Sequence, residues 1–106
     1  MKQIERGSTN VYADLGYEDA DEMLVKAQLA TKIGEIVSQR QLTQTQAAEL
    51  LGISQPKLSN MLRGQFRGIS ETKMIECLTK LGRNVEIVVK AASRSKAAGH
   101  VSVTFA

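Results

Sequence analysis

The sequence is poor in several residue types that would point to particular functions. Its 106 residues include one cysteine, one proline, one histidine and no tryptophan, with only two tyrosines and two phenylalanines. A single cysteine, Cys77, excludes an internal disulfide framework, and so few aromatic residues make a base-stacking surface improbable. No apolar run reaches the roughly 20 residues that a membrane span needs, and the first ten residues are polar, unlike a signal peptide. We therefore expect a cytoplasmic protein with no membrane contact.

Residues for catalysis and metal binding are also scarce. The sequence has one histidine, His100, and no His, Cys, Asp or Glu cluster with a recognised metal-ligand spacing. Its serines have no general base nearby in the sequence to activate them. The acidic residues between 18 and 22 instead suit the N-terminal end of a helix, where they complement the helix dipole. We expect neither an enzyme nor a bound metal or cofactor.

Length and charge together favour one small domain whose second half is basic. The net charge is +3, but residues 1–42 hold 5 basic and 7 acidic side chains, whereas residues 43–106 hold 9 basic and 4 acidic. Between Ile53 and Ser70 the charged residues are Lys57, Arg63 and Arg67, with no acid among them. Such a patch is often just a solvated surface, so its meaning depends on its place in the fold.

Helical patterns fill residues 19–83. Apolar residues recur every three or four positions, and capping residues and glycines mark the boundaries of four helices. The capping box of Thr43 and Gln46 is the clearest of these signals. The expected limits are Asp19 to Arg40, Thr43 to Gly52, Ser54 to Gly64, and Ser70 to Gly82.

After Gly82 the period changes to one typical of strands. Residues 85–89 and 101–105 are rich in β-branched side chains, which predicts a β-hairpin, or one strand with a frayed tail. The expected fold is therefore mainly α: a phage-repressor-like helix-turn-helix domain of four to five helices with a C-terminal β-strand or hairpin. Its parts are an N-terminal arm (1–18), the helix-turn-helix domain (19–83) and an extension (84–106) that we expect to mediate dimerisation.

The second and third helices have the requirements of a helix-turn-helix. Gly52 supplies the residue without a Cβ at the turn, and Ala48 the small residue where the two helices cross. Apolar residues, including Leu51 and Leu58, lock the helices together. A generic pair of helices would not require all of these features at once, so residues 44–63 predict a DNA-binding unit.

The outward face of the third helix carries amides, hydroxyls and cations but no acid. Gln and Asn side chains can pair bidentately with adenine, and Lys or Arg with guanine. A helix N-terminus also favours phosphates. The residues that we expect to contact DNA are Gln44, Ser54, Gln55, Pro56, Lys57, Ser59, Asn60, Arg63, Gln65 and Arg67.

The segment from Leu42 to Gln55 resembles the signature of the Xre/Cro family of phage-type repressors. That resemblance implies five packed helices, or four with a modified end, and a homodimer on a pseudo-palindromic double-stranded DNA operator. It also implies a phosphate contact for Gln44. The matches to Gln55, Pro56, Lys57 and Asn60 lie in the major groove in such repressors. We expect strands to replace the fifth helix here, which changes the usual helical dimer contact.

Three further segments are similar to HigA-type antitoxin-like Xre regulators: Asn10–Tyr17, Met23–Ala27 and Leu81–Ile87. This similarity implies a small basic toxin of the HigB/RelE kind as a partner, and a repressor that controls its own operon. Two alternatives stay open. One is a stand-alone or phage-derived Xre regulator. The other is a protein-interaction adaptor that keeps the fold without binding DNA.

Overall fold

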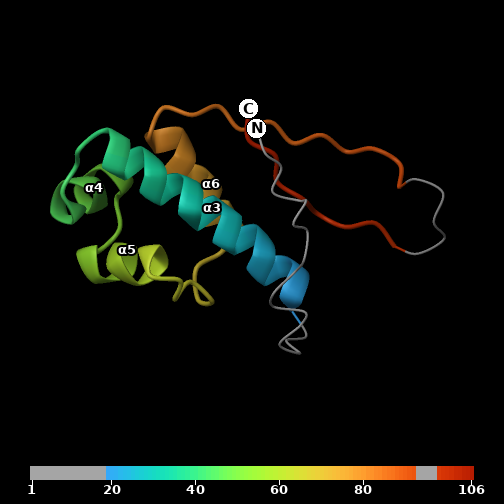
Figure 1. Ribbon diagram of the computed structural model, residues 1–106, viewed down its shortest axis with the longest axis horizontal. Coiled ribbons are helices and arrows are strands. Elements are labelled where there is room, and N and C mark those ends of the chain that lie inside the picture. Colours follow the sequence, from blue (N-terminus) through green and yellow to red (C-terminus); the bar gives the residue numbers. More distant parts are fainter. Residues whose placement is uncertain (1–18, 93–97) are drawn as a thin grey trace.

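A long central helix organises the structure. The computed structural model describes residues 19–92 and 98–106, and within them α3 (Ala20–Gln39) runs through the middle of the helical part (Figure 1). Ile33 and Ile36 of α3 are fully buried, because the apolar residues of this helix repeat every three or four positions. The expected N-terminal arm, residues 1–18, lies outside the described residues.

Two short helices follow α3, and each begins at the expected cap. In α4 (Gln44–Leu51) the Gln46 amide N–H donates to the Thr43 hydroxyl at 3.0 Å, and the Thr43 amide donates to the Gln46 side chain at 2.9 Å. In α5 (Gln55–Leu62) the Ser54 hydroxyl accepts from the Lys57 amide at 3.2 Å. Both caps satisfy N–H groups that have no partner inside the helix, so these predictions are confirmed.

The fourth helix closes the core. α6 (Glu71–Lys80), capped by Ser70 as expected, packs against α3 and α4, while α5 packs against α3 and α4 from another side (Figure 1). Seven fully buried side chains from all four helices meet between them: Ile33, Ile36, Leu51, Leu58, Met61, Met74 and Cys77. The core therefore fixes α5 relative to α3, and leaves the other face of α5 on the surface.

One expected cap is wrong. Asp19 stands at the N-cap position of α3, but its side chain makes no capping hydrogen bond. Its carboxylate instead forms an ion pair with the Arg67 guanidinium, which belongs to the loop after α5. A charged partner is a stronger attraction for a carboxylate than a backbone N–H group, and sequence periodicity does not reveal it.

The expected C-terminal β-strand or hairpin is also wrong. Neither 83–92 nor 98–106 contains a strand; Figure 1 shows them as two extended runs, one leaving the helices after α6 and one returning. Ile87, Val88 and Val89 are 77%, 74% and 90% exposed. β-branched residues favour extended backbone, but two strands alone are marginal in water without a third strand or a surface to cover them.

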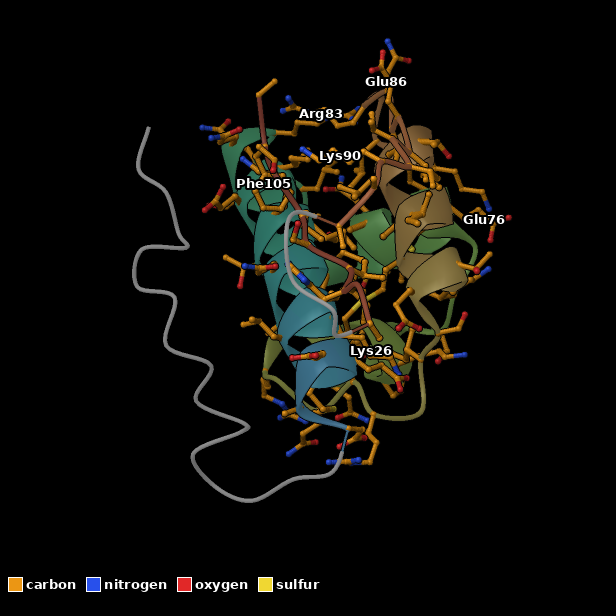
Figure 2. The ribbon with its side chains drawn as sticks, turned by 90° about the vertical axis from the view of Figure 1, so that its right-hand side faces the viewer. Lys26, Glu76, Arg83, Glu86, Lys90 and Phe105 are labelled. Atoms are coloured by element: carbon orange, nitrogen blue, oxygen red, sulfur yellow. The ribbon has the colours of Figure 1, made fainter. Side chains whose placement is uncertain are left out.

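The end of the chain does return to α3. Val103 packs against the core, and the Lys32 ammonium lies 4.8 Å from the centre of the Phe105 ring, which Figure 2 shows beside α3. This geometry suits a cation–π contact. The two extended runs therefore differ, because 101–106 is tied to α3 at its end whereas 85–89 is exposed.

Candidate nucleic-acid interface

The turn between α4 and α5 is held tightly. Gly52 adopts φ +73°, in the left-handed region where a side chain is strained, and the Ile53 amide donates to the Ala48 carbonyl at 3.1 Å. The Lys80 ammonium donates to the Leu51 carbonyl at 3.3 Å, and lies 3.2 Å from where a Cβ on Gly52 would be. The angle between α4 and α5 is thus set by a glycine and by a cation from α6.

The two sides of α5 differ in burial and chemistry. Leu58 and Met61 are buried against the other helices, while Gln55, Pro56 and Lys57 are exposed and Ser59 and Asn60 are half-buried. Arg63, the C-cap of the helix, is exposed as well. The outward face therefore presents amide, hydroxyl and guanidinium groups without a carboxylate of its own helix.

The first residues of α4 and α5 are joined by their side chains. The Gln55 Nε2 group donates to Gln44 Oε1 at 3.0 Å, although the two residues are 11 positions apart. Gln55 keeps its own oxygen and one N–H for another partner, since an amide offers two donors and an acceptor. Sequence reasoning chose both glutamines but missed their contact. The signal was available, because each is the first residue of one helix of the pair.

A second contact joins Arg63 to Asn60. Arg63 Nη2 donates to Asn60 Oδ1 at 2.7 Å, and both residues come from the outward side of α5. The Asn60 backbone is fixed too: its carbonyl accepts from the Gln65 amide at 2.8 Å, while Gly64 takes φ +90°. These bonds form a Schellman-type helix end. Gln65 thus ends α5 through its backbone, and its side chain is exposed.

The loop after α5 is clasped to the start of α3. The Lys26 ammonium donates to the Arg67 carbonyl at 3.0 Å and lies 3.3 Å from Glu22. Lys26 is 4% exposed, the one buried charged residue in the described ranges, and Figure 2 shows it at the N-terminal part of α3. The Arg67 guanidinium pairs with Asp19, so the structure sets it against α3 rather than leaving it as an unpaired cation for DNA. Sequence reasoning missed Lys26.

Burial and nearby lysines have opposite effects on the pKa of the Cys77 thiol in α6. Burial raises the pKa of the Cys77 thiol above its usual value; Lys73, Lys80 and Lys57 favour the thiolate but do not outweigh burial. Cys77 therefore remains an uncharged core residue at neutral pH. At 100° per residue, Lys57 lies about 200° round α5 from Gln55 and next to the buried Met61, so it is on the flank of α5, away from the centre of its outward face.

The part of the chain that the structure describes has an apolar hollow but no cluster of metal-ligating side chains. No group of three or more His, Cys, Asp or Glu residues in 19–92 and 98–106 is placed to hold a metal ion. An open hollow between α3 and α5 has no charged residue in its lining, which is Ala27, Ala30, Thr31, Gly34, Met61, Leu62, Gly64 and Phe66. Among the described helices, none combines the length and apolarity needed to cross a bilayer.

Comparisons with known proteins identify a family and a similar solved structure. The family model described as a helix-turn-helix domain matches residues 11–90. A solved structure described as an XRE-family transcriptional regulator is 36% identical to this chain, with a TM-score of 0.76, and the match covers 83% of this chain and 99% of that one. No curated protein matches the sequence.

Proposed function

Because this chain belongs to the XRE-type helix-turn-helix family and is a DNA-binding regulator, we propose that it is a sequence-specific repressor of transcription. The observation that carries this proposal is the outward face of α5. Its amide and guanidinium groups face solvent, and the helix carries no acidic residue. Side-chain hydrogen bonds hold two of these groups, the Gln55 amide and the Arg63 guanidinium. Groups fixed in advance lose less entropy on binding, which favours specific over loose contact.

The contacts divide by their place on the helix pair. Gln55 lies at the start of α5, and its free oxygen and N–H match the N6 and N7 groups of adenine. Gln44 and Ser54, at the starts of α4 and α5, lie where helix dipoles favour phosphate. Lys57, on the flank of α5, meets a phosphate at the edge of the major groove, the groove in which the Xre/Cro resemblance places its match. Pro56, Ser59 and Gln65 complete the surface.

A homodimer fits the rest of the proposal. Repressors that use this motif place two recognition helices about 34 Å apart on a two-fold operator. The exposed apolar side chains of Ile87, Val88 and Val89, with Val101, give each chain a surface that a second copy would cover. We propose that the dimer contact lies on this extension. The proposal does not require the extension to form strands.

The dimer contact is tested by sedimentation. The full chain is expected to sediment as a dimer at micromolar concentration, and Val88→Asp is expected to weaken that dimer because a charge would be buried. Lys90→Glu, which changes charge without removing apolar surface, is the control. A monomeric wild type, or a Val88→Asp chain that dimerises as well as wild type, would remove the extension from the interface.

The partner proposal is narrower. The similarity to HigA-type regulators, and the acidic balance of residues 1–42, support an antitoxin that binds a small basic toxin of the HigB/RelE kind. The test is capture of the basic protein encoded beside this gene, by the full chain and by a chain lacking residues 1–16. Capture by the full chain alone supports an arm that docks the toxin. No capture by either chain supports the alternative, a stand-alone or phage-derived regulator.

Duplex binding is the test of the regulator itself. A DNA site is first selected from a random duplex library, and binding is then followed by fluorescence anisotropy. Gln55→Ala is expected to lose preference at one base pair, whereas Arg83→Ala, which changes an exposed cation after α6, is the matched control and should bind as wild type does. Failure to select any site would favour the adaptor alternative.

A further inference from the structure

Arg63, the C-cap at the end of α5, lies on the midline of the outward face of this helix. With 100° between successive helical residues, Arg63 lies roughly 80° round the helix from Gln55, with Ser59 between them. The buried Leu58 and Met61 lie on the opposite side. A side chain at the centre of this face points along the direction in which α5 would approach DNA.

The guanidinium of Arg63 is held without being neutralised. Its partner, Asn60 Oδ1 at 2.7 Å, is an uncharged acceptor, and residues 53–62 contain no acid. Asn60 is itself fixed, because it is half-buried on the helix and its carbonyl takes part in the helix end. Arg63 is thus restricted in orientation while it keeps its full positive charge.

The remaining donors of Arg63 suit one base. A guanidinium has five N–H groups in a planar fork, and Asn60 uses one of them. Two parallel N–H groups match the O6 and N7 acceptors that guanine shows in the major groove, and no other base offers two acceptors there. We propose that Arg63, positioned by Asn60, reads a guanine in each half-site.

The central placement favours a base over a phosphate. The major groove is about 12 Å wide, similar to the width of a helix with its side chains, so the middle of the inserted face meets base edges and its flanks meet the phosphate backbones. Lys57 lies on such a flank and Arg63 does not.

This inference rests on the proposed function, and adds which base pairs the half-site contains. Gln55 and Arg63 are eight residues apart, a rise of roughly 12 Å along the helix, which corresponds to three or four base pairs at about 3.4 Å each. We therefore expect an A·T pair beneath Gln55 and a G·C pair about three or four positions further along.

The experiment uses the full chain and the duplex site selected with it. Each base pair of the half-site is changed in turn, and dissociation constants are measured by fluorescence anisotropy for wild type, Arg63→Ala, Asn60→Ala and the double variant. The affinity of wild type for the duplex should fall roughly 5- to 100-fold when the guanine is replaced. Arg63→Ala should bind both duplexes equally weakly, with the loss of preference confined to that position.

The double variant separates positioning from direct contact. Asn60→Ala should reduce discrimination at the guanine less than Arg63→Ala does, and should reduce it no further once Arg63 is absent, because its effect acts through Arg63. Asn60→Asp keeps the acceptor but adds a charge that competes for the guanidinium, so it too should weaken guanine preference. Arg83→Ala is the control for loss of a cation, and melting curves check folding of every variant.

The outcomes are distinct. If Arg63→Ala binds the selected site more weakly but keeps the wild-type preference at every base pair, Arg63 contacts a phosphate and the inference is overturned. The proposed regulator function would still stand. An additive loss at the guanine in the double variant would also overturn the positioning role of Asn60. If no duplex is selected by the wild type, the proposed function itself fails.

Discussion

Gln55 Nε2 donates to Gln44 Oε1 at 3.0 Å, so the first residues of the two helices of the helix-turn-helix form one unit. Gln44 therefore has two neighbours in the proposed complex, a phosphate and Gln55. A residue that only contacts phosphate positions the protein without reading sequence. Through its bond to Gln55, Gln44 also influences which base is read.

Gln44→Ala is expected to weaken DNA binding on every sequence and to relax preference at the base pair beneath Gln55. Gln55→Ala should cost about 1–3 kcal/mol at that base pair alone. The two effects should be less than additive there, because Gln44 acts through Gln55. Binding of a duplex panel by both single variants and the double variant checks this. Full additivity would separate the two glutamines.

Affinity is expected to fall with salt, because cations that meet phosphates release the counterions of DNA. A plot of log affinity against log salt concentration should be linear with a negative slope. Lys57→Ala should make that slope shallower by about 1 on all sequences, since it removes one phosphate contact. Arg83→Ala should leave the slope as it is. An unchanged slope in Lys57→Ala would take this lysine off the phosphate backbone.

The buried ammonium of Lys26 should contribute to stability through the loop that it holds. Lys26→Met keeps most of the side-chain volume but leaves the Arg67 carbonyl without that donor, and is expected to lower the free energy of unfolding by about 1–3 kcal/mol. Urea unfolding measures the change. Lys32→Met is the control on the same helix, with an expected effect within about 1 kcal/mol because Lys32 is partly exposed. Equal effects of the two variants would contradict the role of Lys26.

Gln41 is the one non-glycine residue with positive φ in the described chain, at +57°, where it ends α3. Because a side chain is strained there and glycine is not, Gln41→Gly is expected to raise the free energy of unfolding by about 0.5–1 kcal/mol. Gln39→Gly, at the last helical residue, should have the opposite sign, since glycine weakens helices. Thermal melting of both variants checks the pair. A Gln41→Gly chain that melts below wild type would show that the Gln41 side chain stabilises the fold in spite of its strained φ.

The helices could be predicted from the sequence because their signals are local. The capping box of Thr43 and Gln46 spans four residues, and the glycine that ends α4 stands directly after it. The outward face of α5 follows from the same periodicity, so the sequence alone places Gln55, Asn60 and Arg63 on this face. How those side chains bond to one another does not follow from periodicity.

The features that sequence reasoning missed or misjudged depend on distant residues. Lys26 and Arg67 are 41 positions apart, and Asp19 and Arg67 are 48 apart, so nothing in either segment predicts the other as its partner. The prediction of C-terminal strands was wrong for a related reason. Alternating Val and Ile residues favour extended backbone, but a sheet also needs neighbours, and in residues 83–92 and 98–106 the chain remains extended without them.

The most direct test of a sequence-specific repressor is the ratio of its affinities for the selected duplex and for a scrambled duplex of equal length and composition. Both are measured by competition at physiological salt, because salt alone changes each affinity. A specific regulator should prefer the selected duplex by about 1,000-fold or more. Equal affinities for the two duplexes would contradict the base-reading face of α5, and with it the central claim.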